Sequence, residues 1–269
     1  VVCTLQGEDT FLDALPEQNR QEAWNVLKKR TKEVDAFIAP SRYFGELMQS
    51  RLEFHSDRLH VVPNGIPVDG YQRSELPFNP PVLGYFARMC HQKGLPMLVD
   101  VFIQLKKHSE HPTLKLMVGG GMGPSDEPVV EAQKSKLKKA GYLDDVTWHS
   151  NLDREQKLDF FSKLTVFSVP ALYGETFGLY LLEAMAAGVP VVQPPHAAFP
   201  EIIETTGGGV IASGLETDDL AKGIDELLKN QTRLRQLSDV AYKSVHESYQ
   251  SAHMAQSVTD VYQSVSNSQ

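Results

Sequence analysis

The feature that most constrains this chain is a regular alternation of short apolar segments and helical patterns between residues 81 and 229. The apolar segments have the length of buried strands, whereas the segments between them carry apolar side chains at helical spacing. We expect strands at 81–87, 114–118, 145–149, 165–169, 189–193 and 209–212. We expect helices at 95–107, 127–140, 153–164, 178–187 and 217–229. Crossovers of this length join parallel strands, so the sequence predicts an α/β fold with a doubly wound parallel sheet.

Weaker patterns flank this alternation on both sides. On the N-terminal side we expect strands at 1–5, 35–39 and 59–62, helices at 18–32 and 42–51, a loop at 7–9 and a linker at 70–80. Three short strands and two helices make a poor independent core, and the chain opens in a strand pattern without Met, so we interpret this part as the remnant of a larger domain. On the C-terminal side we expect helices at 231–247 and 252–266. The second helix carries an apolar stripe formed by Met254, Val258, Val261, Tyr262 and Val265.

Composition and charge narrow the class of protein. Over 269 residues, a hydrophobic content of 41% and a charged content of 22% are typical of a soluble globular chain. The formal net charge of −8 disfavours nucleic acid or an anionic membrane as the main partner. The two cysteines form no disulfide framework, which favours a reducing, cytoplasmic setting, and no apolar run reaches the ~20 residues of a transmembrane helix. The nine histidines form no metal-binding motif, so we expect no metal site.

The stretch Tyr173–Val192 combines a polar loop, an apolar helical segment and a β-branched run. The helix expected at 178–187 is apolar nearly all round, which is typical of a helix buried against a sheet. Glu183 is the exception within it, and Glu175 lies eight residues earlier in the preceding loop. These carboxylates bracket backbone N–H groups that have no helical partner, so we expect an anion between them and hydroxyl groups at either side. Either glutamate alone could instead be an ordinary solvated side chain.

Two cations follow the expected strand at 81–87. Arg88 comes directly after the strand, and Lys93 with Gly94 stands just before the next helix. Because ligands bind at the carboxyl ends of parallel strands, these side chains could clamp a diphosphate, Arg88 by its planar fork and Lys93 as a point charge. Each of them alone could instead be a surface charge.

The whole pattern resembles the retaining GT-B-fold glycosyltransferases of family 4, the glycosyl transferases group 1, whose signature is Glu, seven residues, Glu. It stands here as Glu175-Thr-Phe-Gly-Leu-Tyr-Leu-Leu-Glu183, continued by Ala-Met-Ala-Ala-Gly-Val-Pro-Val-Val. The resemblance covers nearly all of the chain and is most specific between about 80 and 215. It implies a GT-B fold with a Rossmann-like C-terminal domain and a truncated N-terminal domain. We expect the acceptor-side remnant and linker at 1–75, the nucleotide-sugar-binding domain at 76–245 and a C-terminal crossover helix at 246–269.

The resemblance also implies roles for individual residues. Those that would hold the donor diphosphate are Arg88, Lys93 and the backbone N–H groups of Phe177, Gly178 and Leu179. Glu183 would bind the ribose, and Glu175, the catalytic candidate, would orient the donor sugar without being claimed as a nucleophile. Loops beside the nucleoside would contain Gly119, Gly120 and Asn151. Two positions depart from the family pattern. The segment 196–201 replaces a Gly-Gly loop while keeping Glu201, which leaves the donor sugar open, and Gln6 stands where many members have His, which weakens an acid/base assignment there.

The implied reaction transfers a sugar from a nucleotide-diphosphate donor to an acceptor hydroxyl, with retention and without a cofactor or metal ion. The partners would be a nucleotide sugar and a sugar, lipid or small-molecule acceptor, and peripheral membrane contact stays open through the rest of the N-terminal half. Because most of the acceptor side lies outside this sequence, one alternative is a donor-nucleotide-binding fragment without turnover. Another is a GT-B-related sugar-nucleotide epimerase. The sequence leaves the donor base, the acceptor and the oligomeric state open.

Overall fold

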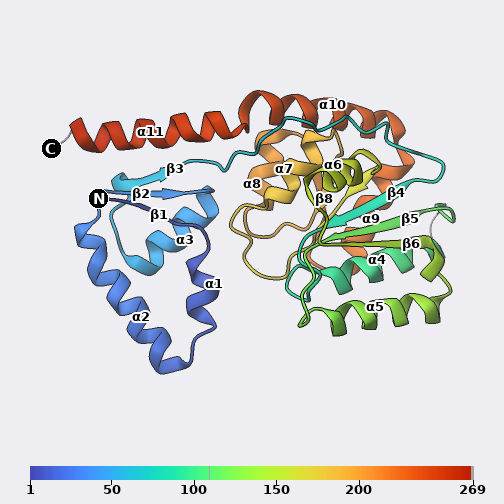
Figure 1. The fold of residues 1–269 in the computed structure, drawn as a ribbon, viewed down its shortest axis with the longest axis horizontal. Coiled ribbons are helices and arrows are strands. Elements are labelled where there is room, and N and C mark those ends of the chain that lie inside the picture. Colours follow the sequence, from blue (N-terminus) through green and yellow to red (C-terminus); the bar gives the residue numbers. More distant parts are fainter. Residues whose placement is uncertain (109, 268–269) are drawn as a thin grey trace.

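The computed structural model describes residues 1–108 and 110–267, which form two α/β units joined by an extended segment (Figure 1). The larger unit is built on a parallel sheet with the strand order β6-β5-β4-β7-β8-β9. Its strands are β4 (Val82–Phe86), β5 (Lys115–Gly120), β6 (Val146–Ser150), β7 (Val166–Phe167), β8 (Val191–Gln193) and β9 (Gly209–Ile211). Each overlaps a predicted strand, and neighbouring strands pair in parallel, so the predicted doubly wound sheet is confirmed.

Helices cover both faces of this sheet (Figure 1). One face carries α4 (Leu95–His108), α5 (Glu127–Ala140) and α9 (Thr217–Lys229). The other carries α6 (Arg154–Ser162), α7 (Leu179–Ala186), α8 (Phe199–Thr206) and α10 (Gln231–Ser248). The strand order changes direction between β4 and β7, which places the ligand-binding crevice of such a sheet at the carboxyl ends of these strands.

Two helices near this crevice differ in how well the sequence predicts them. The apolar helix α7 lies in the core as expected, with Leu181, Leu182 and Met185 fully buried. By contrast, α8 falls in a segment for which the sequence analysis expects no helix. Its buried side chains Phe199, Ile202 and Ile203 do follow helical spacing, but surrounding prolines mask the pattern, and one of them simply occupies the first turn.

The smaller unit is a parallel sheet in the order β1-β2-β3, with β1 (Val2–Thr4), β2 (Ala36–Ala39) and β3 (Leu59–Val61). Its helices are α1 (Glu8–Asp13), α2 (Glu17–Arg30) and α3 (Arg42–Leu52), with 3₁₀ turns at Thr31–Glu33, Ser56–Arg58 and, in the larger unit, Leu143–Asp145. The prediction of a loop at 7–9 is wrong: Gly7 precedes α1, whose first turn begins with Glu8 and Asp9. Acidic residues suit that position because the N-terminal end of a helix is positive.

The last helix, α11 (Ser251–Asn267), leaves the larger unit and packs on the smaller one (Figure 1). Its predicted apolar stripe contacts β2 through Met254, Val258, Val261 and Val265. Tyr262 does not belong to this stripe, since it is 49% exposed. Among the helices of residues 1–108 and 110–267, none has the length and apolar character needed to cross a bilayer.

The segment expected as a linker packs closely on the larger unit. Tyr71 and Leu76 are buried in the main core, and the Ser74 hydroxyl donates to the backbone oxygen of Leu164 at 2.6 Å. The Ser74 amide donates to the oxygen of Ala187, directly after α7. The linker therefore forms part of the wall around α7.

Candidate functional site

The centre of the site is Glu175, in the loop between β7 and α7. Only 7% of this residue is exposed, and one carboxylate oxygen, Oε2, receives three donors. Lys93 donates from 2.6 Å, the hydroxyl of Tyr180 from 2.7 Å and the hydroxyl of Tyr173 from 3.2 Å. The structure thus brings together the predicted residues Lys93 and Glu175, and it adds two tyrosines to which the sequence analysis gives no role.

The ammonium group of Lys93 is enclosed by charge and aromatic rings. It lies 4.8 Å from the ring centre of Tyr173 and 5.3 Å from that of Tyr180, within range of cation–π attraction. Burial lowers the pKa of Lys93, but the charge of Glu175 and the hydrogen bonds to Glu175 and Tyr173 outweigh it, so the net shift is upward. Burial, followed by the negative charge of Glu175, raises the pKa of Tyr180 well above its usual value. Both donors are therefore protonated at neutral pH.

Glycines set the backbone on either side of this cluster. Gly94 has a φ of +73°, and a Cβ there would lie 1.9 Å from the carbonyl oxygen of Pro170, so only glycine lets the chain pass. Gly178 precedes α7 with a φ of +88°, and a Cβ there would lie 3.6 Å from the Cγ atom of Glu175. The Glu175 side chain therefore folds back over the N-terminal end of α7. Phe177 is buried there, whereas Leu179 is 44% exposed.

Glu183 occupies the second turn of α7 and does not lie free among apolar residues. Its Oε1 atom accepts from Lys157 of α6 at 2.6 Å. The hydroxyl of Tyr71 in the linker lies beside it, and burial, followed by the negative charge of Glu183, raises the pKa of that hydroxyl. The side chains of Lys157 and Glu183 are 24% and 17% exposed. The sequence predicts solvent or a ligand hydroxyl as the partner of Glu183, whereas in the structure its partner is the cation Lys157.

Arg88 makes different contacts from Lys93. Its Nε atom lies 3.0 Å from both carboxylate oxygens of Asp126, and its Nη2 atom donates to the hydroxyl of Ser125 at 3.1 Å. The hydrogen bond from Arg88 lowers the pKa of Asp126, which keeps this pair charged. Within the described residues, the structure joins Arg88 to the loop after β5 and not to the Glu175 cluster.

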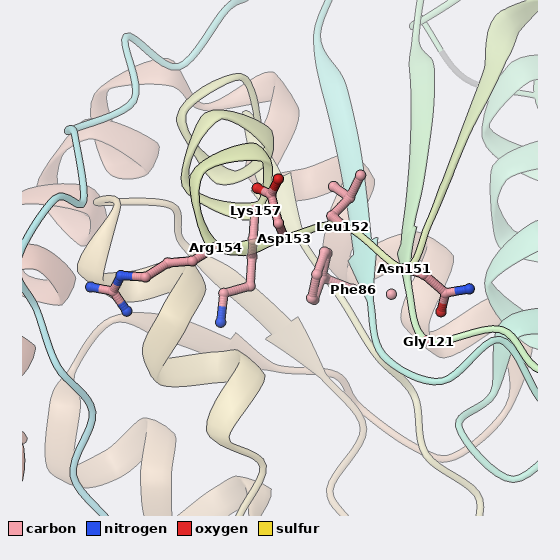
Figure 2. A pocket seen from close by; sticks show the side chains of 8 residues that line it. Phe86, Gly121, Asn151, Leu152, Asp153, Arg154 and Lys157 are labelled. Carbon is pink, nitrogen blue, oxygen red and sulfur yellow. The ribbon is translucent and has the colours of Figure 1, made fainter.

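A cavity of about 580 Å³ opens at the carboxyl ends of β4, β5 and β6. Its lining residues are Phe86, Gly120, Gly121, Asn151, Leu152, Asp153, Arg154 and Lys157 (Figure 2). Gly120 has a φ of +126°, and a Cβ there would lie 2.0 Å from the carbonyl oxygen of Ala87. Gly119 is equally confined, since its Cβ would lie 2.7 Å from the ring of Phe86. These glycines let the carboxyl ends of β4 and β5 approach each other beside the cavity.

Asn151 shapes the wall of this cavity through its amide. Its Oδ1 atom accepts from the amide of Met122 at 2.9 Å, and its Nδ2 atom donates to the oxygen of Met122 at 3.0 Å. The residue has a φ of +55°, a conformation that asparagine tolerates better than most residues. Asn151 therefore fixes the loop after β5 beside the cavity.

The departures from the family pattern also have structural consequences. Gln6 and Asn64 exchange hydrogen bonds of 3.4 and 3.3 Å through their side-chain amides. The Nε2 atom of His196 lies 3.1 Å from the carbonyl oxygen of Tyr173, and because that oxygen only accepts, His196 must donate through Nε2. Ala197 follows with a φ of +53°. The loop after β8 is thus tied to the loop that carries Glu175.

Two hydrogen-bonded contacts connect this edge of the sheet with the smaller unit. The hydroxyl of Ser41, which caps α3, donates to the backbone oxygen of Thr176 at 2.6 Å. Glu201 accepts from the backbone amides of Arg42 at 2.9 Å and Tyr43 at 3.1 Å. A carboxylate is favourable there because the first turn of a helix offers unpaired N–H groups. The retained Glu201 is therefore a cap on α3 in this structure.

Sequence reasoning missed several residues of the site. Arg154 and Lys157 are three positions apart on a predicted helix, so the sequence does indicate that they share one face of it. The pairing of Lys157 with Glu183 left no such signal, because it depends on how α6 and α7 pack together. The same holds for Tyr71, which reaches Glu183 from the linker.

Comparison with known proteins identifies the class to which this fold and site belong. The fold is of the GT-B type, with a Rossmann-like C-terminal unit. The sequence profile of glycosyl transferases group 1 matches residues 71–244, and that of glycosyltransferase family 4 matches residues 1–69. The chain belongs to the glycosyl transferases group 1 family.

Individual relatives are distant. The alpha-maltose-1-phosphate synthase of Mycolicibacterium smegmatis is 24% identical over 261 residues, which are 90% of this chain and 66% of that protein. The sucrose-phosphate synthase of Thermosynechococcus elongatus has a TM-score of 0.81 at 21% identity, covering 100% of this chain and 68% of that one. HepE from Anabaena, solved in complex with UDP-glucose, has a TM-score of 0.78 at 18% identity, covering 98% and 72%. The chain spans between about half and two thirds of the length of the curated relatives that it matches first.

Proposed function

We propose that this chain provides the donor side of a glycosyltransferase that moves a sugar from a nucleotide-diphosphate donor to an acceptor hydroxyl. Family membership supports sugar transfer, and the similarity of fold to HepE, solved with UDP-glucose, supports a nucleotide sugar as the donor class. The observation that carries the proposal is the arrangement around α7. Its N-terminal end adjoins Glu175 and Lys93, and its second turn carries Glu183, which is bound to a residue lining the cavity.

The donor diphosphate would lie against the N-terminal end of α7. When the bond between the sugar and the diphosphate breaks, negative charge grows on the leaving diphosphate, and donors already in place there lower the barrier. Lys93 and the backbone N–H groups of Phe177, Gly178 and Leu179 would supply this stabilisation. Lys93 would then share its charge between Glu175 and the diphosphate, and Arg88 would add a second cation from its position at Asp126.

The two glutamates would have separate tasks. Glu183 would accept hydrogen bonds from the ribose hydroxyls, because its partner Lys157 lines the cavity formed by the loops of Gly120 and Asn151. Glu175 would hold the donor sugar at the point where the diphosphate leaves. Its three donors fix the orientation of one oxygen and leave the other available to a sugar hydroxyl.

We further propose that the anomeric configuration is retained and that the cations of the protein, with no bound metal ion, balance the diphosphate. The Glu-x₇-Glu spacing supports the first proposal, and the position of Lys93 beside α7 supports the second. Transfer that is insensitive to EDTA is the expected result, and restoration by Mg²⁺ after chelation would contradict the second proposal.

The test is to incubate the chain with UDP-glucose, GDP-mannose or ADP-glucose and a panel of simple sugar acceptors. We expect one donor to be consumed, with a product whose NMR spectrum shows the anomeric configuration of the donor. Glu175→Gln should lose this activity while keeping nucleotide affinity. An epimerised free nucleotide sugar would favour an epimerase, and donor binding without consumption would favour a donor-binding module that needs further chain for turnover.

A further inference from the structure

Lys157 is the charged residue of the cavity wall that reaches the ribose-side glutamate. Its Nζ atom lies 2.6 Å from Oε1 of Glu183, and both side chains are largely buried. Figure 2 shows the Lys157 side chain and the Asn151 side chain on opposite sides of Phe86. Removing two such groups from water is costly unless they are paired, so the contact is a defined part of the site.

The linker completes this arrangement. Burial, followed by the negative charge of Glu183, raises the pKa of the Tyr71 hydroxyl, so Tyr71 stays protonated beside Glu183 at neutral pH. Arg154, one turn before Lys157, donates to the backbone oxygen of Asp69 at 2.7 Å and so holds the start of the linker. Glu183 is therefore fixed from two sides, by α6 and by the linker.

The hydrogen-bonding capacity of Glu183 is not exhausted by these contacts. A carboxylate offers about four acceptor sites, and Lys157 uses one of them, with the Tyr71 hydroxyl beside it. The ammonium of Lys157 also balances the charge that Glu183 brings into a helix with no other charged residue. The remaining acceptor sites match the two hydroxyls of a ribose.

We propose that Lys157 is a positioning residue for ribose recognition: it holds the Glu183 side chain oriented toward the 2′- and 3′-hydroxyls of the donor nucleotide, and it does not bind the diphosphate. This inference rests on the proposed function, because it concerns the same nucleotide. It gives the lysine a role that depends on the ribose hydroxyls. A diphosphate-binding lysine would act whether or not those hydroxyls are present.

The experiment is calorimetric titration of UDP, GDP and ADP into the wild-type chain and into Lys157→Met. It is repeated with the 2′,3′-dideoxy form of whichever nucleotide binds. We expect Lys157→Met to bind the ribonucleotide about tenfold more weakly, as for the loss of one charge-assisted contact. The dideoxynucleotide should bind both proteins with affinities within about twofold of each other, because it lacks the two hydroxyls that would donate to Glu183.

Controls separate orientation from general damage. Lys163→Met removes an exposed lysine directly after α6, paired with Asp159, and should bind like the wild type. Lys157→Arg should restore most of the affinity. If Lys157→Met does not fold, the Lys157→Met, Glu183→Gln double variant removes both charges, and it should discriminate the ribonucleotide from its dideoxy form by no more than about twofold.

Two results would overturn the inference alone: an unchanged affinity of Lys157→Met for the ribonucleotide, or an equal loss for both nucleotides, which would place Lys157 at the diphosphate or the base. Failure of the wild-type chain to bind UDP, GDP or ADP is a different outcome. It would overturn the proposed function, and this inference with it.

Discussion

Removal of Lys93 should show how much the ion pair between Lys93 and Glu175 contributes to the stability of the fold. The side chains of Lys93 and Glu175 are 21% and 9% exposed, and Nζ lies 2.6 Å from Oε2. Deleting one partner of such a pair costs about 3–5 kcal/mol, because a buried charge is left unbalanced. The hydroxyls of Tyr173 and Tyr180 still donate to Glu175 and offset part of this loss, so we expect Lys93→Met to lower the free energy of unfolding by about 2–3 kcal/mol.

The assay is urea unfolding followed by the fluorescence of Trp148, which lies on β6 of the larger unit, in a Trp24→Phe background. Glu175→Gln combined with Lys93→Met should recover about 2 kcal/mol relative to the sum of the single variants. The raised pKa of Lys93 means that the pair stabilises the fold below the usual lysine value of 10.5 and that this stabilisation disappears as pH rises through the shifted pKa. The cost of Lys93→Met should therefore be constant between pH 7 and about 9. A cost below about 0.5 kcal/mol, or additive single variants, would refute the reasoning.

Three further changes test other parts of the structure. Gly94→Ala should destabilise the larger unit by at least about 3 kcal/mol in thermal unfolding, because its Cβ would meet the oxygen of Pro170; an unchanged melting temperature would contradict this. Glu201→Ala should cost about 1 kcal/mol and speed hydrogen exchange in the first turn of α3, with no change in α9; equal exchange in α3 would remove the capping role. Val261→Ala should cost about 1–2 kcal/mol, whereas the exposed Tyr262→Ala should be nearly neutral, and the reverse order would show that α11 packs through another face.

The framework of the larger unit was predictable because each element repeats a local pattern. Composition and spacing within a few residues predict the strand at Val82–Phe86 and the helix at Leu95–His108. Prediction failed where a segment carried conflicting local signals. Around Phe199–Thr206, prolines typical of loops surround and open a helix whose apolar spacing is intact.

The site was predictable only in part, because motifs name residues but not their partners. The Glu-x₇-Glu spacing selected Glu175 and Glu183, and position beside a strand end selected Lys93. The main contacts of Glu183 come from elsewhere in the chain: Tyr71 reaches it from 112 residues before it, and Lys157 from 26 residues before it. Such pairings depend on how helices and linker pack, which no local pattern contains.

The most direct test of the proposed donor site is calorimetric titration of UDP, GDP and ADP into the wild-type chain and into two variants, Lys93→Met and Glu183→Gln, with Lys163→Met as the control. We predict that one of these nucleotides binds, that each of the two variants weakens it about tenfold or more, and that the control binds like the wild type. Binding that survives both substitutions unchanged, or no binding of any of the three nucleotides to the wild-type chain, would contradict the placement of a nucleotide diphosphate at the N-terminal end of α7.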